Sequence, residues 1–281
     1  MSNIHGFGEL SENKGGIHNS NSYVNQDDRI YQPSIYKVRS ATFVLLVLNI
    51  SIYIIQLIAF YSYFEKHNKI WGCLLTTFGA FQGGKIKNHY QYYRFITSMF
   101  LHNSASHVGS NSLSLFFLGF QTEYEINNIK QYIILYFISG FAGNFMSLLF
   151  NQESISVGAS GAIIGLCGNF VIYFLLNYRK MSQRKKYSYG IMFLILFANL
   201  FSGLSEGGES INMAAHIGGF LGGFAFSIIL TFKNNFQLQF NNKSFRRLYY
   251  LSTAFIILLP IISIGVLLFK NVSNSIDYIC R

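Results

Sequence analysis

The sequence is poor in charged residues. They make up 11% of its 281 residues, whereas a soluble domain usually has about 25%. Hydrophobic residues make up 51%, and the mean hydropathy is +0.32. The shortage of charge argues against a soluble protein, so we predict a membrane protein.

The sequence also lacks the usual signatures of disulfide, metal and phosphate sites. Its three cysteines, Cys73, Cys167 and Cys280, form no paired framework and no metal-ligand spacing, and Cys167 is expected to be a small apolar packing residue. The zinc motif of metalloproteases and phosphate-binding glycine loops are both missing. We therefore expect neither a metal nor a cofactor.

Long apolar runs fill most of the chain. A helix needs about 20 residues to cross the hydrocarbon core, and seven runs fit or approach this length. They are continuous and do not alternate between apolar and polar residues, which favours helices over the strands of a barrel. They cover roughly residues 41–64, 107–123, 132–150, 156–178, 187–204, 211–232 and 248–269. The predicted fold class is an all-α, polytopic membrane protein.

The segment before the first run is polar and rich in Asn, Ser and Gly, so residues 1–40 are expected to be a disordered tail. No basic start followed directly by an apolar stretch marks a signal peptide, and the first helix is predicted to be a signal anchor. If the N-terminus is cytosolic, 14 of the 21 Lys and Arg residues lie on the inner side. The net charge of +10 then reflects topology, so we expect the bilayer as a partner and no nucleic acid.

Polar side chains recur at one depth of the predicted bundle. The second, fourth and sixth helices enter from the outer face, and His107, Asn111, Ser160 and His216 each lie within about two turns of that entry. Buried polar groups in a membrane are costly and mark candidate functional sites. Any one of them alone is better explained as a hydrogen bonder between packed helices. The four together favour a functional site.

Small residues flank the serine and the histidine. Gly161 and Gly165 form a G-x-x-x-G pattern on the fourth helix, and Gly219 and Gly223 form another on the sixth. Small residues let helix backbones approach closely. We predict that these glycines pack the two helices together, so that the short serine side chain reaches the histidine.

This pairing suggests nucleophilic catalysis. A serine hydroxyl is a poor nucleophile until a base removes its proton, and a partly buried imidazole stays neutral and ready for that role. Ser160 is the candidate nucleophile and His216 the candidate base. The three aspartates lie outside the predicted membrane core, and nothing supports Glu206 or Glu209 as a third member. A dyad is therefore predicted.

Amide hydrolysis also needs donors for the developing oxyanion. His107 and Asn111 are four residues apart and share one face of the second helix. With the backbone at Gly158 and Ser160, they are predicted to form an oxyanion hole. The alternative stays open that His107 is an interfacial histidine and Asn111 a helix hydrogen bonder.

These motifs together resemble the rhomboid family of intramembrane serine proteases. The resemblance covers roughly residues 90–232 and implies Ser160 as nucleophile, His216 as base, and His107 and Asn111 beside the oxyanion. It also implies a six-helix core whose fifth helix gates lateral substrate entry. The matching residues are His102, His107, Asn111, Leu118, Gly119, Glu123, Gly158 to Gly161, Ala215, His216, Gly219 and Gly223.

A seventh helix after this core resembles the six-plus-one arrangement of secretory-pathway rhomboids. The composition, rich in Asn, Ile, Tyr, Phe and Lys, resembles the smaller rhomboids of apicomplexan parasites, which shed surface adhesins. We expect a multi-pass protein of the plasma membrane or a secretory organelle, with a cytosolic N-terminus. The expected parts are a tail (1–40), the six-helix core (41–232), a cytosolic loop (233–247), and the seventh helix with a short outer tail (248–281).

Two positions depart from the family pattern. Tyr93 precedes Arg94 where the family has Trp, and Ile164 replaces an aromatic residue that often supports the histidine. Phe220 is a ring that could take over this support.

The predicted function is cleavage of single-pass membrane proteins near the outer membrane face. A pseudoprotease that binds membrane clients is an alternative, although such a protein would typically lack the serine or the histidine. A transporter is a second alternative, but it would show repeated halves with polar residues at the midplane.

Overall fold

The computed structural model describes residues 40–67, 69–202, 212–234, 242–270 and 280. Every regular secondary-structure element in this part of the chain is a helix. The only strand-like pairing there is an isolated bridge between Phe81 and Ser156. The prediction of an all-α fold is confirmed. The predicted tail covered residues 1–40, and all of it except Ser40 lies outside the described residues.

The first span is α1, Ala41–Ala59, which continues through the π-helix η3, Phe60–Phe64, and the short η4, Glu65–His67. Its start is capped by the carboxylate of Glu123, which accepts hydrogen bonds from the backbone N–H groups of Ala41 and Thr42, both at 3.0 Å. The same carboxylate accepts from the hydroxyl of Ser40 at 2.7 Å. A carboxylate is well placed at a helix N-terminus, where the backbone N–H groups have no partners within the helix.

The first loop is folded into three short helices, which the sequence did not predict: α2, Trp71–Phe78, α3, Gly83–His89, and α4, Arg94–Thr97. Arg94 ties α4 to α2 and to the chain just after it, because its buried guanidinium donates to the carbonyls of Thr76 at 3.0 Å and Ala80 at 2.7 Å. These backbone carbonyls offset the cost of burying the positive charge of Arg94.

The remaining spans follow the prediction to within a few residues. The second is one helical run made of α5, η5 and α6, and each later span is a single helix. The bounds are Ala105–Ser114 (α5), Leu115–Gly119 (η5), Phe120–Ile126 (α6), Ile129–Phe150 (α7), Ser160–Asn177 (α8), Gln183–Ser202 (α9), Met213–Asn234 (α10) and Lys243–Phe269 (α12).

Five of these helices are long and apolar enough to cross a membrane: the run Ala41–His67, α7, α8, α10 and α12. The second span and α9 are more polar. The second carries Glu123 and Glu125 near its C-terminal end, and α9 begins within a basic cluster.

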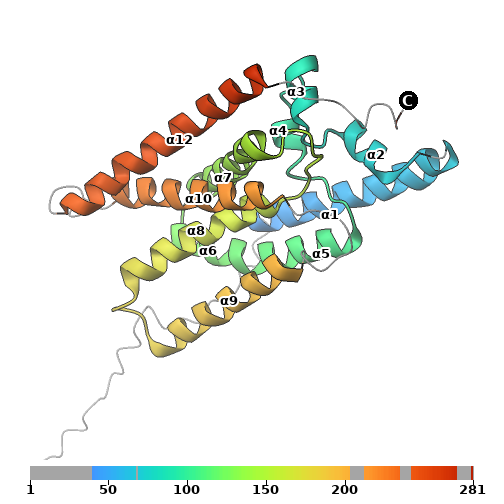
Figure 1. Cartoon of the computed structure of the whole chain (residues 1–281). Helices are drawn as coiled ribbons and strands as arrows, with labels where there is room; N and C mark the ends of the chain where they lie inside the picture. The colour runs from blue at the N-terminus through green and yellow to red at the C-terminus, as the bar shows by residue number, and fades with distance from the viewer. Residues whose placement is uncertain (1–39, 68, 203–211, 235–241, 271–279, 281) are drawn as a thin grey trace, which may run out of the picture.

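Three helices form the centre of the bundle: α7, α8 and α10 (Figure 1). The backbones of α8 and α10 touch, since a Cβ added to Gly223 would lie 2.0 Å from the carbonyl oxygen of Gly165. On its other side α10 meets α7, where a Cβ on Gly218 would lie 2.5 Å from the carbonyl oxygen of Ala142. Figure 1 shows α12 and α9 on opposite sides of this centre, with α9 beside α5.

The prediction that the cysteines form no pair was wrong, whereas the prediction that Cys167 is a buried packing residue is confirmed. Cys73 in α2 and Cys280 near the C-terminus form a disulfide, with their Cα atoms 5.4 Å apart, and Cys167 is the free, buried cysteine. Two lysines of the first loop reinforce this link. Lys87 donates to the carbonyls of Leu268 and Lys270 at the end of α12, at 3.0 and 2.6 Å, and Lys69 donates to the carbonyl of Cys280 at 2.9 Å. The first loop and the end of the seventh helix thus share one face of the molecule.

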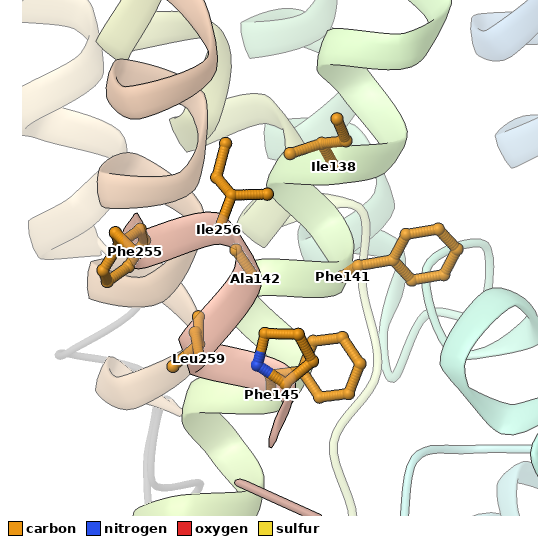
Figure 2. A pocket seen from close by; sticks show the side chains of 8 residues that line it. Ile138, Phe141, Ala142, Phe145, Phe255, Ile256 and Leu259 are labelled. Carbon is orange, nitrogen blue, oxygen red and sulfur yellow. The ribbon is translucent and has the colours of Figure 1, made fainter. Parts of the chain in front are cut away.

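An apolar groove of about 170 Å³ lies between α7 and α12. Figure 2 shows Ala142 and Phe145 of α7 beside Ile256 and Leu259 of α12, and these residues line the groove. Pro260 also lines the groove and lies inside α12. None of the side chains that line the groove is polar.

Candidate active site

Ser160 is the first residue of α8. Gly158, two residues earlier, has a φ of +122°, a backbone conformation that side-chain-bearing residues rarely adopt. The loop is fixed by a hydrogen bond from Gly158 N–H to the carbonyl of Ser98 at 2.9 Å and by the bridge between Phe81 and Ser156. The first loop therefore helps to hold the serine at the start of its helix.

His216 lies in the first turn of α10. Its Nε2 is 2.9 Å from Ser160 Oγ, which is hydrogen-bond distance. The pair is possible because Gly219, one turn further along, lies against the backbone of Gly161, where a Cβ would come within 2.1 Å of the carbonyl oxygen. The structure thus brings together two side chains that are 56 residues apart in the sequence.

His107 and Asn111 lie beside the same loop. A Cβ added to Gly158 would lie 2.8 Å from Nε2 of His107 and 3.5 Å from Nδ2 of Asn111. The absence of a side chain at Gly158 leaves this space open. Because the N–H of Gly158 is bonded to Ser98, Gly158 contributes space and not a donor.

Hydrogen-bond donors surround this space. Within the described residues, Nδ2 of the buried Asn111 has no hydrogen-bond acceptor. The N–H of Ser160 belongs to the first turn of α8, where backbone donors have no partner within the helix. His107 completes the group with its ring edge toward Gly158.

The candidate acidic partners of His216 cannot be placed, since Glu206 and Glu209 lie outside the described residues. Among the residues that are described, Nδ1 of His216 has no hydrogen-bond partner. The same part of the chain holds no group of three or more His, Cys, Asp or Glu side chains that could bind a metal ion. Phe220 stacks on Phe224, with ring centroids 6.0 Å apart.

His102 packs against His107, one of the residues of this site. Its ring lies edge-on to that of His107, with centroids 5.2 Å apart, and it is fully buried. Burial, and to a lesser extent the nearby His107, lowers the pKa of His102 to about 3. Its backbone is held by Gln56 of α1, whose side chain donates to the carbonyl and accepts from the N–H of His102, both at 3.1 Å.

Sequence reasoning missed Gln56 and Asn212. Gln56 is a buried polar residue in an apolar span, which is itself a signal of a functional or structural contact. Asn212 stands just before α10 and bonds to two residues at the end of α7. Nothing in the local sequence of Asn212 reveals these partners.

A family model described as "Rhomboid domain" matches residues 89–233. This segment holds His107, Asn111, Ser160 and His216. RHOMBOID-like protein 2 of Arabidopsis thaliana is 35% identical over 133 residues, 46% of this chain and 42% of that protein. Rhomboid-like protease 3 of Toxoplasma gondii is 29% identical over 109 residues, 39% of this chain and 41% of that protein. Rhomboid protease GluP of Bacillus subtilis (strain 168) is 32% identical over 110 residues, 39% of this chain and 21% of that protein. The chain matches less than half of the length of each of these relatives.

Proposed function

Because the chain belongs to the rhomboid family, we propose that it is an intramembrane serine endopeptidase in which Ser160 and His216 form a catalytic dyad. The observation that carries this proposal is the 2.9 Å contact between His216 Nε2 and Ser160 Oγ. Two of the relatives are themselves named proteases.

In the proposed reaction, Ser160 Oγ attacks the carbonyl carbon of the scissile peptide bond while its proton passes to His216 Nε2. The negative oxygen of the tetrahedral intermediate accepts hydrogen bonds from Asn111 Nδ2, His107 and the N–H of Ser160. The C–N bond then breaks, and His216 gives its proton to the leaving amine. Water, deprotonated by His216, next attacks the carbonyl carbon of the acyl-enzyme ester. The bond from this carbon to Ser160 Oγ breaks, His216 returns the proton to Ser160 Oγ, and the second product is released as the carboxylic acid.

The proposed substrates are single-pass membrane proteins, with surface adhesins as candidates. A helical backbone hides its carbonyls in internal hydrogen bonds, so the cleaved segment must unwind before Ser160 can attack it. Segments with small or helix-weakening residues near the outer membrane face fit this requirement.

The proposed orientation places the N-terminus in the cytosol and the site near the outer face. The disulfide between Cys73 and Cys280 supports it, because disulfides persist in oxidising compartments outside the cytosol. The disulfide lies on the face of the first loop, and the predicted inner loops hold most of the basic residues. A secretory-pathway membrane or the plasma membrane satisfies both observations.

The proposal is tested by co-expression with a single-pass reporter that carries Ala-Gly near its outer boundary. We expect wild type to release the ectodomain and Ser160→Ala to release none. Ser62→Ala is the matched control, because Ser62 is exposed in η3 and bonds only to the nearby carbonyl of Ala59. Release by Ser160→Ala at the wild-type level would overturn the proposal, and a pseudoprotease would release none in any variant.

A further inference from the structure

We propose that Asn212 is a positioning residue for His216: it ties the start of α10 to the end of α7 and so sets the depth and rotation of the base relative to Ser160. This inference rests on the proposed dyad and adds a residue outside it. It is carried by hydrogen bonds that converge on one side chain.

The side chain of Asn212 uses both of its ends. Its Oδ1 accepts from the N–H of Ala215 at 3.1 Å and from Nδ2 of Asn151 at 2.8 Å. Its Nδ2 donates to Oγ of Ser147 at 2.5 Å. Ser147 is fully buried in the last turn of α7, and Asn151 is the residue that ends that helix.

The backbone of Asn212 is bonded directly to the base. Its carbonyl accepts from the N–H of His216 at 3.2 Å, so the two residues are separated by one helical turn, about 6 Å along the axis. A shift of Asn212 along the axis of α10, or a rotation around it, therefore moves His216 by a similar amount.

The other contacts of α10 with α7 and α8 bring the helices close together but do little to fix their relative depth and rotation. Around the site, α10 meets α8 through Gly219 and Gly161, and it meets α7 through Ala215 and Gly143. Glycine surfaces allow backbones to touch, yet they offer no long side chain that interlocks. The directional bonds of Asn212 with Ser147 and Asn151 supply what the glycines lack.

A simple helix cap would make only part of this pattern. Capping needs an acceptor toward the first N–H groups of the helix, and the bond from Ala215 provides it. The bonds to Ser147 and Asn151 serve no capping purpose. Removing Ser147 Oγ therefore separates the two roles, because it leaves the cap of α10 intact.

The test uses the purified full-length protein in liposomes and measures two quantities: kcat and KM on the reporter, and the rate at which a fluorophosphonate probe labels Ser160. We expect Asn212→Ala and Ser147→Ala to lower kcat and the labelling rate by about 10-fold to 10²-fold, since small misplacements of a catalytic group cost that much. KM should stay within about twofold, because these residues do not touch the substrate. The two substitutions should also be non-additive, as expected for partners in one bond.

Two matched controls separate positioning from general damage. Ser139→Ala removes another fully buried hydroxyl from α7, one that bonds only within its own helix to Leu135. Asn242→Ala removes the same kind of cap from α12, where the side chain accepts from Phe245 N–H at 2.9 Å. Both should keep wild-type kcat and labelling, and their melting temperatures calibrate any loss of stability.

Wild-type labelling and kcat in Ser147→Ala and Asn212→Ala would overturn the inference and leave the dyad standing. Equal losses in the Ser139→Ala control would also overturn it, because the effect would then be general. Full activity of the Ser160→Ala variant would instead overturn the proposed function itself.

Discussion

Gly219 and Gly161 are in backbone contact, with no room for even one methyl group between α10 and α8: a Cβ on Gly219 would lie 2.1 Å from the carbonyl oxygen of Gly161. This contact lies one turn from His216 and next to Ser160. The hydrogen bond between the two candidate catalytic residues therefore depends on the absence of side chains as much as on the residues themselves.

Replacing Gly219 with Ala is expected to push the two helices apart. We expect a destabilisation of about 1–3 kcal/mol, typical of an overpacked core, together with loss of most proteolytic activity. Gly265→Ala is the matched control, because nothing lies within 4 Å of a Cβ at that position of α12. Melting temperature and reporter cleavage measure both effects, and an active, undamaged Gly219→Ala would contradict the packing argument.

The oxyanion donors make a separate prediction. Asn111→Ala and His107→Ala should each lower kcat, by up to about 10² to 10³-fold for a strong donor, with little change in melting temperature. Gly109→Ala tests the same helix without touching the site, since no atom lies within 4 Å of that added Cβ. Wild-type kcat in both of the first variants would remove these residues from the mechanism.

The disulfide predicts a pattern of thiol accessibility. In unreduced membranes, a maleimide reagent should modify no cysteine until the protein is unfolded, and then only Cys167, because Cys73 and Cys280 are bonded to each other. After reduction of the unfolded protein, all three should react. Cys73→Ser and Cys280→Ser should each expose one new thiol and lower the melting temperature equally. Reaction of all three cysteines without reductant would contradict the link and the orientation that rests on it.

His102 predicts how stability changes with pH. Its pKa in the folded protein is lowered from 6.5 to about 3, mainly by burial and also by His107. The unfolded chain therefore binds a proton that the folded protein does not bind, and this contribution to stability is complete above about pH 6.5 and is lost as the pH falls toward 3. The melting temperature of wild type should drop between pH 7 and 5, and His102→Gln should drop less. His89→Gln, at an exposed histidine, should behave like wild type; an unchanged pH slope in His102→Gln would refute the assignment.

The sequence was sufficient to predict the spans and the pair at the centre of the site. Apolar runs have a length that the bilayer dictates, and Ser160 and His216 stood out as polar residues flanked by glycine. The disulfide was missed because Cys73 and Cys280 are 207 residues apart and nothing local links them. The contacts of Asn212 were missed for the same reason, since they depend on how α7 and α10 meet in space.

The folded first loop was a different kind of miss. Its helices are too short to give a periodic signal. Arg94 links α4 to α2 through the carbonyls of Thr76 and Ala80, and these partners are known only from the folded structure. In the sequence, Arg94 is one basic residue among several in that loop.

Ser160 is proposed to be a nucleophile that His216 activates. The most direct measurement is fluorophosphonate labelling of the purified protein in liposomes, with the modified residue located by mass spectrometry in wild type, Ser160→Ala and His216→Ala. We predict a single modification on Ser160 in wild type and none in either variant. Labelling of His216→Ala at the wild-type rate, or a modification on another residue that persists in Ser160→Ala, would contradict the claim.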